Sequence, residues 1–254
     1  MVDRLFSDAA LAALYDALCP RTQRADFDFY LPLVMSATAV LDVGCGTGAL
    51  LHEARRLGHR GQLCGLDPAP GMLAQAGKQS DIEWMLGDLA SATWESEFDL
   101  VVMTGHAFQA FIGDDELRAA LVAIRSALAG HGRFAFETRN PLAREWENWR
   151  PENAVEVIDA HGKTVRVQTQ MVTPFDGNTV SFTHTFTGLT WDGPKVSWST
   201  LRFLSTDGLS ALLAETGFTI EEQFGDWDRQ PLVGTCPKII TIARRSINES
   251  KNGE

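Results

Sequence analysis

Asp42 and a run of alternate glycines are the residues whose types and spacing are best suited to hold a ligand. The stretch V-L-D-V-G-C-G-T-G-A-L over residues 40–50 places Asp42 two residues before Gly44, Gly46 and Gly48. An apolar run that ends in such glycines is typical of a strand, a tight loop and the start of a helix. Glycine adopts positive φ and lets a ligand approach the backbone, and the first N–H groups of a helix are unpaired. The stretch therefore predicts a ligand-binding loop.

Two classes of cofactor fit a loop of this kind. Dinucleotide-binding folds use G-x-G-x-x-G or G-x-G-x-x-A, and Gly44, Gly46 and Ala49 satisfy that spacing. Asp42 argues against a dinucleotide, because a carboxylate beside a pyrophosphate is electrostatically unfavourable. S-adenosylmethionine (SAM) instead carries a sulfonium and an ammonium group and no phosphate. A glycine-rich turn without a ligand is the third possibility.

The D-x-G-x-G-x-G run resembles motif I of the class I SAM-dependent methyltransferases. The resemblance is close over residues 40–136 and looser over residues 205–245. It implies an α/β, Rossmann-like fold: a doubly wound, mostly parallel seven-stranded sheet with an antiparallel last strand. It also implies SAM as the cofactor and S-adenosylhomocysteine as the product, held by Asp42, Gly44, Gly46 and Gly48.

Asp67 is the next residue to which the resemblance gives a role. It ends a predicted strand over residues 62–66 and lies 19 residues after Gly48. This is near the spacing at which an acidic residue reaches a ribose diol, and one carboxylate can accept from both hydroxyls. The alternative is that Asp67 caps a predicted helix over residues 68–79.

Four further cofactor contacts are expected, two of them from the resemblance. After a predicted strand over residues 82–86, Asp88 matches the acidic residue that bonds the adenine amino group, and Leu89 matches the neighbour whose N–H meets the ring. Asp88 is otherwise a solvated turn residue. Met72 is expected to pack on the adenine or to fill the core. Thr104 follows the fourth predicted strand, at the edge where open α/β sheets bind ligands.

In-line methyl transfer depends mainly on positioning, although a hydroxyl acceptor would also need a base. His106, in the loop after a predicted strand over residues 98–103, has a suitable unperturbed pKa of about 6.5. It could instead contact the cofactor or pack on the insertion described below. Glu137, at the end of the fifth predicted strand, is a second candidate, but the sequence favours its pairing with Arg139. Tyr15 is a third candidate, with core packing as the alternative.

The chain is expected to divide into a cofactor domain and an insertion. Residues 1–139 and 205–245 form the domain, and residues 246–254 are a disordered tail. Residues 140–204 contain alternating runs separated by turn signals, so we expect a small antiparallel β lid beside the cofactor. The turns are expected at His161-Gly162, Asp176-Gly177-Asn178 and Asp192-Gly193.

Residues 1–36 are expected to form a helical cover, packed over the mouth of the site or on the flank of the sheet. Apolar residues recur at helical spacing over residues 7–18, and a second amphipathic segment spans residues 26–35. Both tyrosines of the chain, Tyr15 and Tyr30, lie in this cover. Either could reach the reacting methyl group, and core packing is the favoured interpretation of Tyr30.

The composition indicates which classes of partner and which cellular compartment to expect. The chain has 254 residues, 44% hydrophobic residues and a formal charge of −11, which argues against nucleic acid or an anionic membrane as the main partner. No stretch approaches the roughly 20 apolar residues of a membrane span. The four cysteines lack a C-x-x-C pair, so we expect free thiols in the cytoplasm. No metal-ligand spacing is present.

The sequence therefore predicts a methyltransferase that uses SAM to methylate a nitrogen or oxygen atom, less readily a carbon atom, of a small molecule. An NAD-dependent oxidoreductase is one alternative, and a non-catalytic SAM-binding module is another. No motif in the cover or the insertion identifies the acceptor or the oligomeric state.

Overall fold

A seven-stranded sheet forms the centre of the computed structural model, which describes residues 2–77, 81–188 and 191–246. Its strands are β1 Ala39–Val43, β2 Gln62–Asp67, β3 Glu83–Leu86, β4 Phe98–Met103, β5 Leu128–Arg139, β10 Phe218–Phe224 and β11 Lys238–Arg245. The strand order is β10-β11-β5-β4-β1-β2-β3. Strands β3, β2, β1, β4 and β5 pair in parallel, and β11 runs antiparallel between β5 and β10. The predicted doubly wound sheet with an antiparallel last strand is confirmed.

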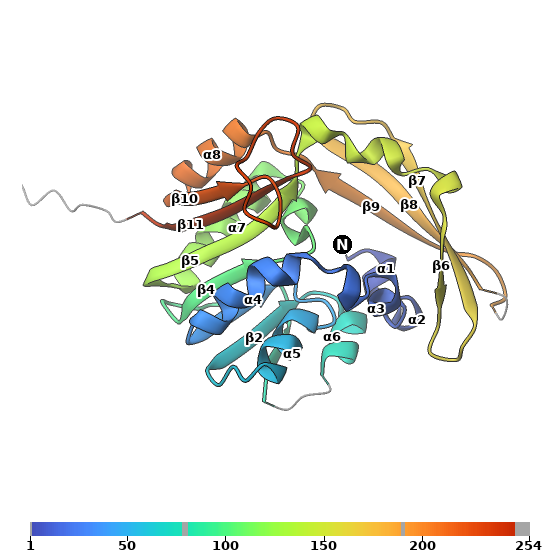
Figure 1. Cartoon of the computed structure of the whole chain (residues 1–254), viewed down its shortest axis with the longest axis horizontal. Helices are drawn as coiled ribbons and strands as arrows, with labels where there is room; N and C mark the ends of the chain where they lie inside the picture. The colour runs from blue at the N-terminus through green and yellow to red at the C-terminus, as the bar shows by residue number, and fades with distance from the viewer. Residues whose placement is uncertain (1, 78–80, 189–190, 247–254) are drawn as a thin grey trace, which may run out of the picture.

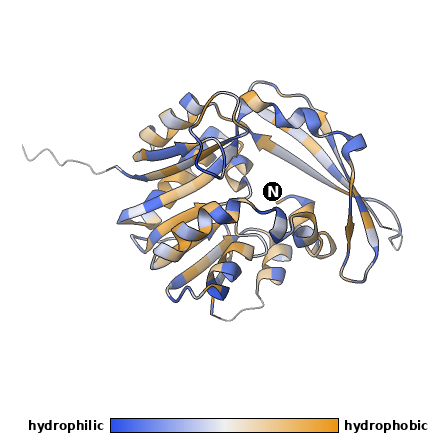
Figure 2. Cartoon of the chain, viewed as in Figure 1, coloured by the Kyte–Doolittle hydropathy of each residue, from blue (hydrophilic) through white to orange (hydrophobic). Residues whose placement is uncertain are grey.

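Helices cover both faces of this sheet (Figure 1). The helices are α4 Asp26–Ser36, α5 Ala49–Arg56, α6 Pro70–Ala76, α7 Asp114–Ala127 and α8 Thr206–Glu215. Val40 and Val102 of the central strands share one buried cluster with α4 and α5. Leu41 and Val101 share the other cluster with α7 and α8. Strands buried on both faces read as nearly continuous apolar runs, and Figure 2 shows hydrophobic residues concentrated along them.

A second sheet of four antiparallel strands lies between β5 and α8 in the chain. Its strands are β6 Val155–Ile158, β7 Thr164–Thr173, β8 Thr179–Gly188 and β9 Lys195–Arg202. They pair in sequence order, each antiparallel to the next. Figure 1 shows this sheet standing beside the N-terminal helices and apart from the central sheet.

The first cover segment differs from the prediction. The sequence predicts one helix over residues 7–18, whereas the structure has three short helices, α1 Arg4–Ser7, α2 Ala9–Ala12 and α3 Tyr15–Leu18. The break after α1 arises because Asp8 is extended and its carboxylate accepts from the N–H groups of Ala10 and Leu11. Asp8 thus caps a new helix and ends the preceding one. The second segment is one helix, α4, as predicted.

The cover connects the two sheets. The Leu5 N–H donates to Ser197 Oγ at 2.8 Å, and Lys195 Nζ donates to Asp8 Oδ1 at 3.0 Å. Leu5, Leu11 and Leu14 form a buried cluster with side chains of β7 and β8. On its other side the cover packs on α6, where a Cβ at Gly71 would lie 2.6 Å from the Phe6 carbonyl oxygen. The helices before β1 are therefore held by both halves of the molecule.

Element boundaries elsewhere agree with the prediction within a few residues. The first helix after the glycines begins at Ala49, because Gly48 is left-handed with a φ of +73°. Strand β5 is longer than the predicted run over residues 133–136. Residues 78–80, at the end of the helix predicted over 68–79, and residues 247–254 of the predicted tail lie outside the described residues. Among the described residues, no helix is long and apolar enough to span a bilayer.

Candidate functional site

The loop between β1 and α5 leaves open space at one of its glycines. Gly44, Gly46 and Gly48 all have positive φ, at +73°, +57° and +73°. A Cβ at Gly44 would lie 2.8 Å from the Ala107 Cβ, and one at Gly48 would lie 2.3 Å from the Trp84 ring. A Cβ at Gly46 would meet no described atom within 4 Å. The outer two glycines are therefore required by protein packing, whereas Gly46 leaves room for a ligand.

Asp67 holds the tip of this loop. The Gly46 N–H donates to Asp67 Oδ2 at 2.8 Å, and the Ala69 N–H donates to Oδ1 at 2.8 Å. The second bond closes a turn just before α6 and is not the helix cap that the sequence left open, because the N-cap of α6 is Ala69 and no side chain caps it. A carboxylate has about four acceptor positions, so two bonds leave capacity for a ligand hydroxyl. Burial raises the pKa of Asp67, and the two N–H groups lower it.

Asp42 is a buried carboxylate with an unused oxygen. It is 1% exposed in the middle of the sheet, and its Oδ1 atom accepts no hydrogen bond from any described residue. Burial raises its pKa to about 7; Asp67 and Glu137 add to the rise, and Arg24 opposes it. An unpaired buried acceptor costs free energy of folding. A cationic ligand that binds beside this carboxylate would offset that cost.

Glu137 bridges the cover and the loop after β4. It is 1% exposed; the Tyr30 hydroxyl donates to its Oε2 atom, and the His106 N–H donates to its Oε1 atom at 2.8 Å. The favoured prediction of a Glu137–Arg139 pair is wrong, since Arg139 Nε pairs with Glu145 at 3.2 Å. The reason is burial: Glu137 lies beneath α4, where the hydroxyl of the fully buried Tyr30 needs an acceptor.

His106 occupies a turn that is unusual for a residue with a Cβ. It is left-handed, with a φ of +63°, and its Nδ1 atom lies 3.8 Å from Glu137 Oε1 without a described hydrogen-bond partner. Burial holds the pKa of His106 well below its ordinary value, and Arg139, Lys238 and Arg24 lower it further. The imidazole is therefore neutral at physiological pH and has a lone pair to accept a proton.

Tyr15 and Thr104 lie close to the same loop. Tyr15 is half-buried on α3, and its hydroxyl would be 3.9 Å from a Cβ placed at Gly105. Burial raises its pKa, so the phenol remains protonated. Thr104 follows β4 and is 9% exposed. The structure therefore brings Tyr15, Thr104, His106 and Glu137 to the carboxyl end of β4 and β5.

The remaining predicted cofactor residues, Asp88, Leu89 and Met72, make contacts with other parts of the protein. Asp88 is exposed, and its Oδ1 atom accepts from the N–H groups of Ala90 and Ser91, as a turn residue would. Leu89 is 6% exposed and packs in the core. Met72 is 2% exposed and lies among Ala12, Ala69 and the half-buried Tyr15. Its contacts in this structure are those of a core residue.

Sequence reasoning missed a buried ion pair at the start of α4. Both oxygens of Asp26 accept from Arg24, whose Nη2 donates at 2.7 Å and whose guanidinium lies 4.4 Å from the Phe27 ring centroid. The charge of Arg24 lowers the pKa values of both Asp42 and Glu137. The signal in the sequence was weak, because an arginine and an aspartate two residues apart before an apolar helix are ordinary surface residues.

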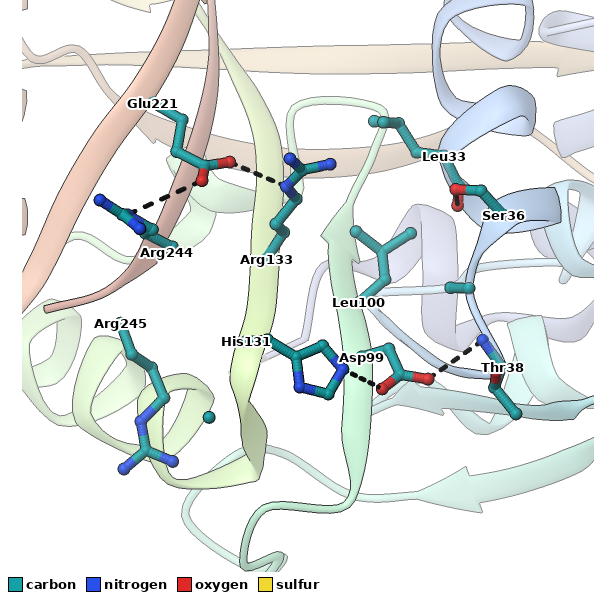
Figure 3. Close-up of a pocket in the computed structure, with 12 residues that line it drawn as sticks. Leu33, Ser36, Thr38, Asp99, Leu100, His131, Arg133, Glu221, Arg244 and Arg245 are labelled. Carbon is teal, nitrogen blue, oxygen red and sulfur yellow. Dashed lines mark hydrogen bonds and ion pairs between the residues drawn. The ribbon is translucent and has the colours of Figure 1, made fainter. Parts of the chain in front are cut away.

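A cavity of about 560 Å³ lies at the amino ends of β1 and β4, on the side of the central sheet opposite to the glycine loop (Figure 3). Its polar groups pair with one another: Asp99 Oδ1 with His131 Nε2 at 3.1 Å, and Glu221 with Arg133 at 2.8 Å. Asp99 Oδ2 also accepts from the Thr38 N–H at 3.0 Å. This cavity is separated from the glycine loop by the length of the strands and is not part of the candidate site.

The residues at the carboxyl edge fit SAM better than a dinucleotide. Two buried carboxylates, Asp42 and Asp67, lie beside the loop, and the open position at Gly46 admits a ligand against the backbone. A sulfonium and an ammonium group complement these charges, whereas a pyrophosphate would be repelled. No group of three or more histidine, cysteine, aspartate or glutamate side chains in the described part of the chain could hold a metal ion.

Comparison with known proteins points to the same chemistry. Residues 40–132 match the family described as "Methyltransferase domain". The 2-phytyl-1,4-naphtoquinone methyltransferase of Thermosynechococcus vestitus is 48% identical over 64 residues. That match spans 23% of this chain and 28% of the relative's length.

Solved structures share the fold over nearly the whole chain. The CcbJ methyltransferase from Streptomyces caelestis has a TM-score of 0.73 and 17% identity, covering 95% of this chain and 99% of that one. SAM-bound CalS10, an amino pentose methyltransferase from Micromonospora echinaspora, has a TM-score of 0.65 and 23% identity, covering 92% and 97%. The sugar N-methyltransferase KedS8 from Streptoalloteichus has a TM-score of 0.67 and 21% identity, covering 92% and 93%.

The glycine geometry predicts different effects for two similar substitutions. Gly46→Ala should cost only about 1–2 kcal/mol of stability, the penalty of a left-handed residue, yet strongly weaken SAM binding because the methyl group enters the open space. Gly48→Ala should lower the melting temperature further, since its Cβ would overlap the Trp84 ring. Thermal unfolding and calorimetric titration with SAM check both. Unchanged affinity in Gly46→Ala would contradict this assignment of the loop.

Asp42 predicts a pH-dependent stability without ligand. Its pKa in the folded state is about 7 and exceeds the ordinary 3.8. The contribution of Asp42 to the free energy of unfolding is therefore fully present below pH 3.8 and is lost as pH rises through 7. The loss is at most about 4 kcal/mol, from roughly three pKa units. Asp42→Asn should therefore gain stability relative to the parent between pH 4 and pH 8 in denaturant titrations. Asp192→Asn, at an exposed turn, is the control and should track the parent. A parallel profile for Asp42→Asn would contradict the account.

Proposed function

We propose that this chain, which belongs to the class I SAM-dependent methyltransferases, transfers the methyl group of SAM to a nitrogen or oxygen atom of a small-molecule acceptor. The observation that carries the proposal is the unpaired, buried Asp42 carboxylate beside the glycine loop. Its neighbours Asp67 and Glu137 make the carboxyl edge of the sheet strongly acidic. An edge of this charge selects cationic ligands.

The residues that would hold SAM are those of the β1 loop and the ends of β2 and β3. Asp42 and the backbone at Gly46 would receive the amino-acid part, and Asp67 would receive the ribose hydroxyls. Asp88 and the Leu89 N–H would receive the adenine, with Met72 beneath it. SAM supplies an electrophilic methyl group whose leaving thioether is neutral.

The acidic edge favours an amine as the acceptor. Amines are protonated near neutral pH, and the carboxylates of Glu137 and Asp42 would attract the ammonium form. The amine must then lose a proton before its lone pair can attack. His106 is neutral and would accept that proton, or the proton of a hydroxyl acceptor, although its lowered pKa makes it a weaker base than an exposed imidazole. Tyr15, protonated and close to the same turn, would orient the acceptor by donating a hydrogen bond.

The four-stranded sheet and the N-terminal helices would act together as the lid of the site. The cluster of Leu5, Leu11 and Leu14 with Phe186 joins them, so they would enclose the acceptor as one unit. Enclosure excludes water and strengthens the electrostatic contacts inside. Two of the structural relatives are named as an amino pentose and a sugar N-methyltransferase, and these names support a small amine as the acceptor.

Methyl transfer can be tested directly. With tritiated SAM and a panel of small amines and alcohols, we expect labelled product from at least one amine. His106→Asn should lower kcat by about 10²-fold or more, as expected for loss of a general base. His131→Asn, at the opposite edge of the sheet, is the matched control and should behave as the parent.

Three results would separate the competing functions. Binding of NADH with no binding of SAM would favour the oxidoreductase. Tight SAM binding with no transfer to any acceptor would favour the non-catalytic module. Full activity in His106→Asn would keep the methyltransferase but remove the proposed base.

A further inference from the structure

The Glu137 carboxylate is shared between two elements that are far apart in the chain. Its Oε2 atom accepts from the Tyr30 hydroxyl on α4, and its Oε1 atom accepts from the backbone N–H of His106 after β4. Two of the three residues are almost completely enclosed, since Tyr30 is 0% and Glu137 1% exposed, whereas the His106 side chain is 16% exposed. The arrangement therefore links the helical cover to the proposed proton acceptor through one side chain.

The backbone at His106 needs this support. Gly105 and His106 are consecutive left-handed residues, with φ values of +65° and +63°. That conformation is disfavoured for a residue with a Cβ, so an interaction outside the turn must maintain it. The charge-assisted bond from the His106 N–H to the carboxylate is such an interaction.

The same carboxylate also faces the imidazole ring. His106 Nδ1 lies 3.8 Å from Glu137 Oε1 and has no other described partner. An ionised carboxylate at this position favours the tautomer with its proton on Nδ1. In this tautomer the lone pair is on Nε2, so Nε2 is the atom that would accept a proton from a substrate.

We propose that Glu137, held by the Tyr30 hydroxyl, is the positioning residue for His106: it fixes the turn and selects the Nδ1–H tautomer of the ring. The inference deepens the proposed function, in which His106 accepts the proton. Tyr30 also takes part, because its hydroxyl donates to Glu137 Oε2 and so orients the Glu137 carboxylate.

The charges around Glu137 make this device sensitive to pH. Burial raises the pKa of Glu137 to about 7; the Tyr30 and His106 bonds and the Arg24 charge oppose the rise, and Asp26 adds to it. Asp42 on β1 also interacts with Glu137. Arg139 on β5 and Lys238 on β11 act on the His106 ring. Tyr30 keeps its proton throughout, because burial and Glu137 hold its pKa well above the ordinary value.

The test follows the His106 ring by NMR with ¹⁵N-labelled histidine, using the full chain without ligand. We expect the Nδ1–H tautomer at pH 8.5, and a change in its ring signals near pH 7 as Glu137 takes up a proton. Glu137→Gln should abolish that change. Tyr30→Phe should move it upward by roughly one pH unit, since the ionised carboxylate loses a hydrogen bond.

Thr138→Val is the matched control. Thr138 neighbours Glu137 on β5, is 1% exposed, and its hydroxyl has no described hydrogen-bond partner. Its profile should match that of the parent protein, which would show that losing a buried polar side chain from β5 does not by itself remove the change of the His106 signals.

The proposal is overturned if the His106 proton is on Nε2 in the parent at pH 8.5, or if Glu137→Gln keeps both the tautomer and the pH-dependent change of the parent. The first measurement needs no substitution, so it decides the matter even if a variant fails to fold. The outcome is separate from that of the proposed function. Absent methyl transfer with this titration intact would reject the function alone.

Discussion

The structure depends on the burial of several carboxylates at one edge of a parallel sheet. Asp42 and Glu137 are each 1% exposed, Asp67 is 6% and Asp26 is 7%. Burying ionisable groups costs free energy, and folded proteins keep such clusters mainly where they serve a site. Here Arg24 neutralises one of them directly, and backbone N–H groups or hydroxyls satisfy two others. Asp42 alone among these four retains a buried oxygen without a described partner.

The rest of the fold positions and protects this edge. Parallel strands bring the ends of β1, β2, β4 and β5 together, and the left-handed glycines turn the chain after β1 and leave open space at Gly46. The cover helices are held by α6 on one side and by the four-stranded sheet on the other. A site enclosed in this way strengthens charge interactions, since the local dielectric is lower than in water.

The sequence predicted the elements whose position depends on local residue patterns. The strand over residues 98–103 agrees with β4 at both ends, because an apolar run between polar turns leaves one solution. The glycines located the loop because their backbone conformation is intrinsic to the residue. The first cover segment, residues 7–18, was predicted as one helix in error, since the break at Asp8 is reinforced by Lys195, 187 residues away.

The candidate site was predictable for the same reason and only to the same extent. The glycine loop and Asp67 follow from spacing within one strand–loop–helix unit. The partner of Glu137 did not, because Tyr30 lies 107 residues away and reads as an ordinary core residue. Arg24 was missed because two of the carboxylates on which its charge acts, Asp42 and Glu137, lie on β1 and β5, far from it in the chain. Contacts of this kind, between elements far apart in the chain, cannot be predicted from local residue patterns.

The central claim is that Asp42 is a neutral or partly neutral acid that ionises when a cationic cofactor binds. Calorimetric titration of SAM at pH 6.5, in buffers of different ionisation enthalpy, counts the protons released on binding. The account predicts a net release of protons in the parent protein and a smaller release in Asp42→Asn. Binding without proton release, or equal release in both proteins, would contradict it.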